Sequence, residues 1–421
     1  MCILFRELLF TISTLCLCLT VSTFGIESDV STGKILPQQP RLELIHDAVF
    51  SPDGKYIGIG TQEGFLLYER EGMRLVYFLD MPGEVYFLKW SPNSARVLLA
   101  HWPGNPLGLF EGMDIPSYSI LDIKAKKIIS TFQESVRWNI THTVGLQYHT
   151  EDGSTEFLWD SIYPSSFMIS HPNALVFSPD GQEIALITQE NRIRFYDVET
   201  GKMKQEIRHD LDHHLISVGY SAGNQEIWTG TLRSIVLYWN RETGLMTNSL
   251  LLKFMSENDQ LGVVKAYALS ENQTSFLALT AFKDLRYEVA GNLNKYNAQS
   301  GQLIDVKAIG NGYFPRHRAS FISDSDLVIA LISYTDGDNL FKHDSYYHLE
   351  YYYDPVLTRI RTFYEYGLPN VRRFLAQPFA RDGSEFLLLE DTWLYIVNAE
   401  TLEFETFTIQ PSAVEEFQVY E

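Results

Sequence analysis

The pentapeptide FSPDG occurs at Phe50–Gly54 and again, letter for letter, at Phe177–Gly181. Each copy stands between two apolar stretches, which are followed by a further turn and an aromatic stretch. Asp, Gly and Pro provide the local hydrogen bonds, the positive φ and the preset φ of tight turns. A motif that recurs within one chain indicates a repeated supersecondary unit, so we expect the whole fold to be built from such units.

Six further turn signals extend the series beyond the two FSPDG copies. They are Ser91-Pro92-Asn93-Ser94, Glu151-Asp152-Gly153, Ser221-Ala222-Gly223-Asn224, Ser270-Glu271-Asn272-Gln273, Ser323-Asp324-Ser325-Asp326 and Arg381-Asp382-Gly383-Ser384. Most of the eight signals are followed by a short apolar stretch, which predicts a strand. These predicted strands are Tyr56–Gly60, Val97–Ala100, Ile184–Ile187, Glu226–Thr229, Phe276–Leu279, Val328–Ile332 and Phe386–Leu389.

Most of these predicted strands are apolar on both faces, whereas a sheet with one wet face would show alternation. A propeller buries both faces of each blade between two neighbouring blades. Short strands at regular spacing, with Gly-rich turns and no long helical periodicity, indicate an all-β closed repeat. The sequence therefore predicts a β-propeller.

Three closing segments carry a resemblance to a known family: Phe195–Gly201 (FYDVETG), Tyr238–Gly244 (YWNRETG) and Tyr296–Gly301 (YNAQSG). With the FSPDG turns and a period of a little over forty residues, they make the chain similar to the bacterial WD-repeat-like propellers. The resemblance covers roughly residues 42–410. It implies an all-β propeller of seven or eight four-stranded blades, because the unit at about 136–170 is either a blade or an insertion in its neighbour.

The first 25 residues have the layout of a secretory signal peptide. One arginine, Arg6, precedes an apolar run from Leu8 to Val21, which is short for a membrane span, and small residues follow. A retained signal anchor is the alternative. We expect a signal peptide at 1–25, a linker at 26–41 and the propeller at 42–421.

All three cysteines, Cys2, Cys16 and Cys18, lie in this first segment. Once the signal is removed the chain has no cysteine, whereas exported eukaryotic domains of this size usually carry disulfides. A bacterial periplasmic or secreted location is therefore expected, with no membrane insertion after signal removal.

Charge and composition limit the class of partner. The formal net charge is −20, and a nucleic-acid binder needs a basic surface, so no nucleic-acid partner is expected. Aromatic residues make up 14% of the 421 residues, an excess that suits strands.

The Tyr-rich stretch His343–Pro355 is the first candidate site. Tyrosine is enriched in protein interfaces, which would make this stretch an exposed binding surface. The alternative is a hairpin that packs on a neighbouring blade. The candidate binding residues are Tyr346, Tyr347, His348, Tyr351, Tyr352 and Tyr353.

Two polar clusters are weak candidates for a metal ion. Imidazole and carboxylate ligands occur together at His209, Asp212, His213 and His214, without the spacing of an established zinc motif. Asp336–Asn339 is rich in oxygen ligands of the kind that calcium prefers, but Asp-Gly is more typical of a hairpin turn. No bound metal and no cofactor is expected.

No catalytic motif is present. The chain lacks Gly-x-Ser-x-Gly and any phosphate-binding Gly-rich loop between a strand and a helix. A Pro/Gly-rich stretch, His101–Pro106, could place Trp102 at one mouth of the propeller, or form an ordinary surface loop.

The sequence therefore predicts a non-catalytic platform that binds another protein or a surface polymer. The alternative is a propeller enzyme, such as a hydrolase, a lactonase or a quinone-dependent dehydrogenase, with the cluster at 209–214 near its site. Both hypotheses rest on fold-level analogy.

Overall fold

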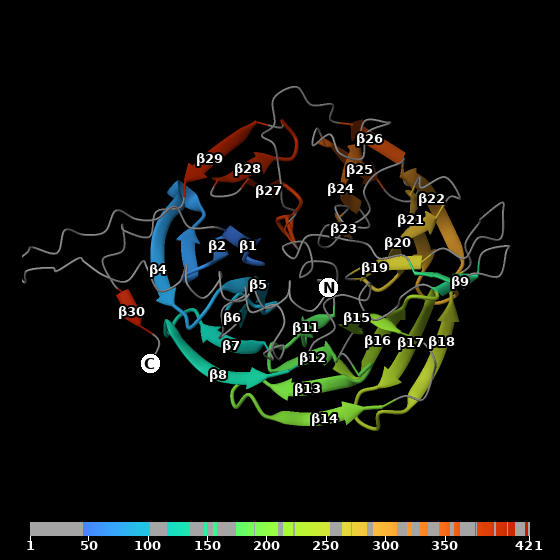
Figure 1. The fold of residues 1–421 in the computed structure, drawn as a ribbon, viewed down its shortest axis with the longest axis horizontal. Helices are drawn as coiled ribbons and strands as arrows, with labels where there is room; N and C mark the ends of the chain where they lie inside the picture. Colours follow the sequence, from blue (N-terminus) through green and yellow to red (C-terminus); the bar gives the residue numbers. More distant parts are fainter. Residues whose placement is uncertain are drawn as a thin grey trace, which may run out of the picture. The chain divides into compact units, whose positions relative to one another are not determined.

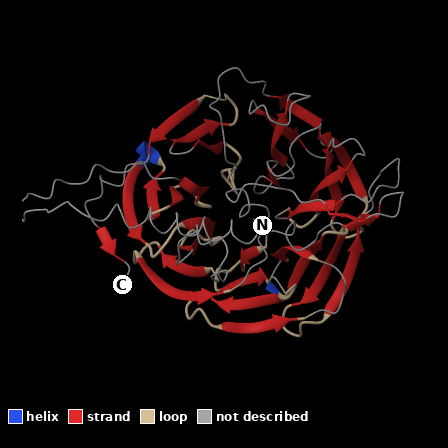
Figure 2. Cartoon of the chain, viewed as in Figure 1, coloured by secondary structure: helices blue, strands red, loops and turns tan. Residues whose placement is uncertain are grey.

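The structure is a computed structural model, in which Leu42–Glu421 is one of two separate units of the chain. It describes residues 45–101, 116–134, 147–149, 155–157, 174–188, 190–208, 214–221, 224–252, 263–270, 272–283, 289–309, 318–321, 328–335, 345–353, 358–362, 375, 377–390, 393–401, 403–408 and 417–419. Strands predominate among them, and η1 (Glu71–Met73) is a short 3-10 helix (Figure 2).

Six sheets contain four antiparallel strands in chain order, and each is a complete propeller blade. Blade 1 comprises β1 (Ile45–Phe50), β2 (Tyr56–Thr61), β3 (Gly64–Glu69) and β4 (Arg74–Asp80); blade 2 comprises β5 (Val85–Trp90), β6 (Arg96–His101), β7 (Ser117–Asp122) and β8 (Lys127–Gln133). Blade 3 comprises β11 (Leu175–Phe177), β12 (Glu183–Ile187), β13 (Ile193–Asp197) and β14 (Met203–Ile207); blade 4 comprises β15 (Leu215–Tyr220), β16 (Glu226–Thr231), β17 (Ile235–Asn240) and β18 (Met246–Leu251). Blade 5 comprises β19 (Val263–Leu269), β20 (Ser275–Lys283), β21 (Val289–Asn297) and β22 (Leu303–Ile309); blade 6 comprises β23 (Arg318–Phe321), β24 (Val328–Thr335), β25 (Ser345–Tyr353) and β26 (Thr358–Thr362).

Two smaller sheets and one added strand complete the described part. The last sheet has three strands, β27 (Glu385–Glu390), β28 (Trp393–Asn398) and β29 (Phe404–Thr408). β9 (Gln147–His149) and β10 (Thr155–Phe157) form a two-stranded sheet. β30 (Phe417–Val419) joins blade 1 as a fifth strand beside β4. The blades follow one another around a common centre, with the last sheet beside blade 1 (Figure 1).

The expectation of seven or eight four-stranded blades is wrong for the described residues, which form six. In the last sheet the place of an innermost strand is taken by a single bridge between Phe379 and Phe386. Within the unit expected at 136–170 the described residues are those of β9 and β10, and blade 2 packs directly against blade 3. An eighth blade is excluded at that place because the two faces that would flank it already touch each other.

The prediction that the second strand of each unit is buried on both faces is confirmed in the blades whose side chains are described throughout. Every residue of β12 is buried, and in β2, β6 and β16 only the first residue is partly exposed. The apolar side chains lie between neighbouring blades instead of inside one blade. Each pair of neighbours therefore shares its own core.

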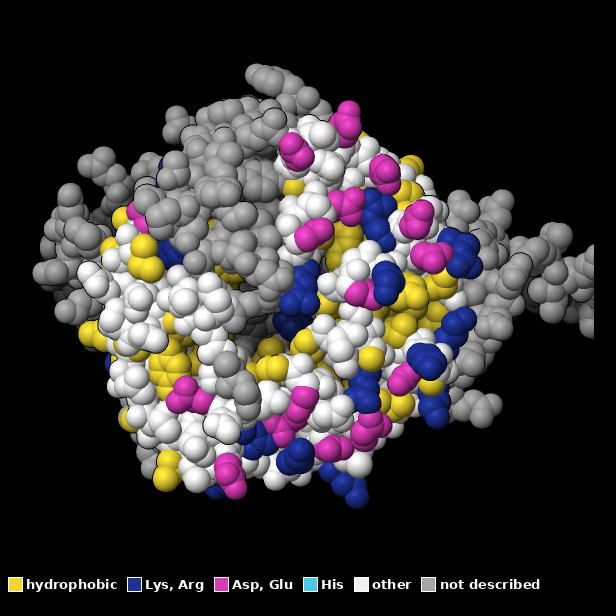
Figure 3. Space-filling view, turned by 180° about the vertical axis from the view of Figure 1, so that it is seen from behind, with side chains coloured by type: hydrophobic (Ala, Val, Ile, Leu, Met, Phe, Trp, Pro, Cys, Tyr) yellow, Lys and Arg dark blue, Asp and Glu magenta, His cyan; other side chains and the backbone are white. Residues whose placement is uncertain are grey.

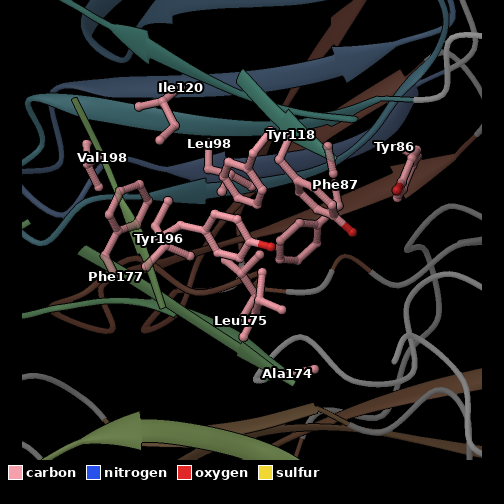
Figure 4. Close-up of a cluster of buried hydrophobic side chains, with 14 residues drawn as sticks. Tyr86, Phe87, Leu98, Tyr118, Ile120, Ala174, Leu175, Phe177, Tyr196 and Val198 are labelled. Atoms are coloured by element: carbon pink, nitrogen blue, oxygen red, sulfur yellow. The ribbon is translucent and has the colours of Figure 1, made fainter. Parts of the chain in front are cut away.

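The interface between blades 2 and 3 illustrates such a core (Figure 4). The ring of Phe132 from β8 stacks on Tyr118 of its own blade at 5.1 Å between centroids and on Tyr196 of blade 3 at 4.2 Å. Leu98 and Leu175 are fully buried in the same cluster. Aromatic residues in excess thus serve as packing between blades.

The two FSPDG turns have the same hydrogen bonds. In the first, Ser51 Oγ donates to Asp53 Oδ1 at 2.7 Å and accepts from the amide of Tyr56 at 2.9 Å. In the second, Ser178 Oγ donates to Asp180 Oδ1 at 2.6 Å, and Gly181 has a φ of 70°. The turn is closed by side chains of its own residues, which explains why its sequence recurs.

The closing segments form a second repeated turn. Asp197 Oδ1 accepts from the amide of Thr200 at 2.9 Å, and Asn240 Oδ1 accepts from the amide of Thr243 at 2.8 Å. Asn297 and Asn398 accept in the same way. These turns connect the third and fourth strands in blades 3, 4 and 5, as the sequence indicated, and they connect β28 and β29 in the last sheet.

Candidate interaction face

The blade topology divides the connections between two ends of the unit. In a four-stranded antiparallel meander, the connections from the first to the second strand and from the third to the fourth lie at one end. The connection from the second to the third strand and the one to the next blade lie at the other end. We call the first the turn end and the second the loop end.

Connections at the turn end are short and nearly equal. Those between first and second strands cover residues 51–55, 91–95, 178–182, 221–225, 270–274 and 322–327. Those between third and fourth strands cover 70–73, 123–126, 198–202, 241–245, 298–302, 354–357 and 399–403. All of them therefore have four to six residues.

Connections at the loop end are unequal. Those between second and third strands cover 62–63, 102–116, 188–192, 232–234, 284–288, 336–344 and 391–392. Those from one blade to the next cover 81–84, 134–174, 208–214, 252–262 and 310–317. Their lengths run from two residues to 41, so sequence variation between the units is concentrated at this end.

Hydrogen bonds between blades show that like ends lie side by side. At the turn end, the amide of Asp53 donates to Ser94 Oγ of blade 2 at 3.0 Å. At the loop end, the amide of Leu215 donates to Asn191 Oδ1 of blade 3 at 2.8 Å, and the amide of Val264 donates to the carbonyl of Leu232 at 3.3 Å. The loop ends of these neighbouring blades therefore lie side by side.

Four innermost strands have a β-bulge near their loop end. Register shifts separate Ile45 from Asp47, Val85 from Phe87, Leu215 from Ser217 and Val264 from Ala266. In each case the bulge lies near the first residue of an innermost strand, which is its loop end. Bulges re-aim side chains and are frequent next to functional sites. The residues inserted there are His46, Tyr86, Ile216 and Lys265.

A polar cluster joins blades 1 and 2 at the loop end. Glu84 Oε2 lies 3.3 Å from His46 Nε2, and Glu84 Oε1 accepts from Gln62 Nε2 at 3.3 Å. The side chains of His46 and Glu84 are 13% and 19% exposed, so water still reaches the cluster. Two connections and the inner strand β1 thus contribute to one polar site.

A buried carboxylate lies beside this cluster. Asp47 accepts from the amide of Ala48 at 3.0 Å and from the amide of Leu88 in the neighbouring inner strand at 2.9 Å. Burial lowers the pKa of Lys89 to about 8, although the charge of Asp47 opposes this shift. Asp47 therefore connects two inner strands and places a negative charge near Lys89.

The turn end carries ion pairs between blades. Arg96 pairs with Glu199 of the next blade, Glu183 pairs with Arg241, and Glu385 of the last sheet pairs with Arg70 of blade 1. In each pair one residue begins a second strand and the other follows a third strand. On the face drawn in Figure 3, acidic and basic side chains are interspersed.

The predicted Tyr-rich residues lie on a blade strand. Tyr346, Tyr347, His348, Tyr351, Tyr352 and Tyr353 belong to β25, the third strand of blade 6. This strand pairs with β24 along Val328–Thr335 and with β26 along Thr358–Thr362. Their role as a binding surface stays a prediction.

The predicted metal ligands are only partly described. His214 stands directly before β15, where its carbonyl accepts from the amide of Leu232 at 3.0 Å. His209, Asp212 and His213 lie outside the described residues, as does the Asp336–Asn339 stretch. Among the residues that the structure describes, no three His, Cys, Asp or Glu side chains are close enough to hold a metal ion.

His101 belongs to a blade core instead of a loop, which corrects the sequence interpretation at this residue. It ends β6, is 3% exposed, and its Nε2 lies 3.0 Å from Ser119 Oγ, which is 3.1 Å from Thr131 Oγ1. Trp102 and the rest of the Pro/Gly-rich stretch lie outside the described residues.

His101 is expected to make the fold sensitive to acid. Burial lowers the pKa of His101 from its ordinary value of 6.5 to about 4. The hydrogen bond with the Pro82 carbonyl raises the pKa, but by less than burial lowers it. Because the pKa of His101 is lower in the folded state than in the unfolded state, neutral His101 contributes its full stability above about pH 6.5. This contribution is lost as the pH falls towards 4. Relative to His101→Gln, the protein should lose about 2 kcal/mol between pH 7 and pH 5. Urea unfolding at both pH values measures this, and parallel pH curves would contradict it.

Sequence reasoning missed Asp47, Glu84 and Lys89. Asp47 stands in an otherwise apolar strand three residues before the first FSPDG, and Lys89 interrupts the apolar run VYFLKW. The sequence signal for Asp47 and Lys89 is a charged residue inside an apolar strand. This signal alone does not identify a site, because the partners of these charges come from another repeat unit.

Comparisons with known proteins found two similarities. No family model matches the chain. The bovine WD repeat-containing protein 55 (Bos taurus) is 26% identical over 91 residues, which cover 19% of this chain and 23% of that protein. The β-propeller domain of Cps50 (Swd1) from Myceliophteria thermophila shares 10% identity, with a TM-score of 0.49 over 89% of this chain and 100% of that chain. In the described part, no helix has the length and apolar character to cross a membrane.

A buried hydrogen bond joins the second and third strands of blade 4. Trp239 of the YWNRETG segment donates from Nε1 to Thr229 Oγ1 of the neighbouring strand at 2.9 Å, and both residues are buried. The four-stranded blades, the repeated closing turn and the similarity to a WD-repeat protein agree. The chain folds as a WD-repeat-like β-propeller.

Proposed function

We propose that this protein is a non-catalytic interaction platform that binds another protein or a surface polymer through its loop end. The observation that carries the proposal is the contrast between the two ends. The turn end repeats connections of four to six residues, whereas the loop end varies from two residues to 41. Closing the ring of blades does not require long connections. Binding residues are concentrated on loops that a rigid scaffold holds in place.

The composition of a long loop-end connection supports a protein partner. Residues 102–116 contain Trp102, Leu107, Leu109 and Phe110. Aromatic and aliphatic side chains of this kind are the anchors of protein interfaces. The net charge of −20 favours cationic partners over nucleic acid.

The proposal includes export to a bacterial periplasm or outside the cell. It is supported by the signal-like residues 1–25 and by the absence of cysteine after Cys18. Cleavage is expected between Thr23 and Glu27. N-terminal sequencing of the protein captured below checks this, and an intact Met1 on a membrane-bound product would contradict it.

Shortening two loops tests the binding face. His101 pairs with Ser117, and Thr335 pairs with Ser345, so a two-residue Asn-Gly turn can replace residues 102–116 and 336–344 without breaking the strand register. The matched control inserts nine Gly/Ser residues between Gln299 and Ser300 at the turn end. The shortened variant should lose at least about tenfold in affinity, since interface anchors contribute about 2 kcal/mol each.

The readout is affinity capture from the native envelope, followed by mass spectrometry. A stoichiometric partner that the control retains and the shortened variant loses supports the proposal. A partner that the control loses and the shortened variant keeps would place binding at the turn end. Capture of no stoichiometric partner by the unaltered protein would overturn the platform hypothesis.

A further inference from the structure

The outer strand of blade 4 lacks the charged residues that the other outer strands carry. β18 reads MTNSLL and has no charge. Charged side chains on an edge strand oppose its pairing with a further strand. The outer strands β4, β8, β14, β22, β26 and β29 each contain at least one: Arg74 and Asp80, Lys127, Lys204 and Glu206, Asp305 and Lys307, Arg359 and Arg361, and Glu405. The outer edge of β18 is therefore the least protected of these edges.

Apolar side chains are exposed on β18 and around it. Met246 and Leu251 are 47% and 59% exposed, and Leu245 in the preceding turn is 68% exposed. Further exposed apolar side chains lie on β14 and β22, the outer strands on either side (Figure 1), namely Met203, Ile304 and Val306. These are six of the eight exposed large apolar side chains in the described part, and β18 lies at their centre.

The backbone of β18 presents hydrogen-bonding groups at its outer edge. The amide of Leu252 donates to the carbonyl of Ser234 at 2.8 Å, so every second residue back to Asn248 faces β17 in this antiparallel ladder. The backbone groups of Ser249 and Leu251 therefore face outward. The amide of Ser249 donates to Asn248 Oδ1 at 2.9 Å, a local bond that a second strand can replace. Within the described residues, no strand pairs with β18 on this side.

Another outer edge of the same propeller shows that there is room for a strand at this position. β4 and β18 each have a bulge, at Val76 and at Thr247. β30 lies beside β4 from Phe78, the second residue after the bulge. Ser249 is the second residue after the bulge of β18. The edge at Ser249 is therefore equivalent to one that pairs with a strand in blade 1.

The exposed side chains of β18 complement one another under a two-fold rotation. Met246, Ser249 and Leu251 lie opposite residues of β17 that pack against blade 3, so these three side chains share one face of the sheet. Two antiparallel copies of β18 related by a two-fold axis at Ser249 place this serine opposite itself. Leu251 of each copy then lies beside Met246 and Thr247 of the other, so that apolar side chains meet apolar side chains.

Charged residues near the two ends of β18 have opposite signs. Glu242 is exposed in the turn before the strand, and Arg233 is exposed in the connection whose Ser234 bonds to Leu252 just after it. In an antiparallel pair the start of each strand lies beside the end of the other, which brings Glu242 of one copy towards Arg233 of the other. The net charge of −20 opposes association, but physiological salt screens it beyond about 8 Å.

We propose that β18 forms the interface of a homodimer, in which its outer edge pairs antiparallel with β18 of a second copy around a two-fold axis at Ser249. Strand addition to an open sheet edge gives affinity through backbone hydrogen bonds. The same contact covers the exposed side chains of Met246 and Leu251. Because one surface contacts its own copy, the association is complete at two chains.

Opposite charges at Ser249 test the position of the axis. Ser249 is exposed, so a charge there does not disturb the blade core. Ser249→Lys and Ser249→Glu each place like charges opposite each other, and each variant should raise the dissociation constant of the dimer at least about tenfold. An equimolar mixture of the two variants places opposite charges there and should restore the dimer. Val306→Lys is the matched control, since Val306 is the second residue after the bulge of β22. It should leave the dissociation constant unchanged.

Sedimentation velocity of the purified full-length protein, up to about 100 μM, gives the dissociation constants, because this range includes micromolar affinities. A dimer of the unaltered protein that each single variant loses and the mixture restores supports the proposal. An unaltered protein that stays monomeric would overturn it. A dimer that persists in Ser249→Lys would also overturn it, because association then occurs elsewhere, for instance through the apolar run at 8–21. Failure of the mixture to restore the dimer, or equal loss in Val306→Lys, would show that Ser249 does not lie at the axis.

Discussion

Gly64→Ala is expected to lower the free energy of unfolding by at least about 3 kcal/mol, because the site fails in two independent ways. Gly64 begins β3 with a φ of 147°, a conformation that essentially only glycine adopts. A Cβ atom there would lie 2.1 Å from the carbonyl oxygen of Leu79. Because that oxygen belongs to the paired backbone of β4, it cannot move without breaking the blade.

Gly54→Ala is the matched control for this prediction. Gly54 closes the first FSPDG turn with a φ of 70°, and a Cβ there meets no atom within 4 Å. Its expected cost is about 1 kcal/mol, from backbone conformation alone. Urea denaturation of the two variants compares them directly. Equal midpoints would show that the close approach of β3 to the Leu79 carbonyl does not constrain blade 1.

Glu183→Gln is the second change with a large expected effect, about 3 kcal/mol of lost stability. The Glu183 side chain is 10% exposed, and Glu183 accepts from Arg241 Nε at 2.7 Å and from Tyr220 Oη at 2.8 Å. Arg241 also stacks over the ring of Phe195 at 3.8 Å. Neutralising the carboxylate leaves the Arg241 charge largely buried at the interface of blades 3 and 4 without its main partner.

The control is Glu199→Gln in the equivalent pair between blades 2 and 3. Its side chain is 53% exposed, so water screens the pair with Arg96 and the expected cost is below about 1 kcal/mol. Thermal or urea unfolding at pH 7 measures both. Similar losses in the two variants would show that burial does not set the strength of these interblade pairs.

The effect of Glu183 also has a defined pH dependence. Burial would raise the pKa of Glu183, but hydrogen bonds from Arg241 and Tyr220 outweigh it and lower the pKa below 4.5. A depressed folded pKa means that the stabilisation is present above the unfolded value and is lost as the pH falls. The difference between the protein and Glu183→Gln should therefore shrink below about pH 4.5.

Much of each repeat unit could be predicted from the sequence because its turns are closed locally. Ser51, Asp53 and Gly54 form their hydrogen bonds with one another and with the next strand, and Asp197 bonds to Thr200 three residues later. The seven predicted second strands all fall within observed strands for the same reason. Hydrophobic burial on both faces then indicated a propeller before any contact between blades was known.

The candidate face and the blade count were not accessible in this way. The difference in connection length between the turn end and the loop end becomes visible only when the order of the strands in each sheet is known. Each connection must first be assigned to one of the two ends. The hydrogen bond from the Leu88 amide to Asp47 joins two neighbouring blades across 41 residues of sequence.

The repeat unit of this protein, with its turn, its paired strands and their apolar faces, follows from residues within a few positions of each other. The tertiary structure decided how many units are complete, that the stretch after β8 is no blade, and that the last strand returns to the first sheet. These features arise from contacts between units, where the energy of packing and pairing depends on distant residues that no local pattern reports.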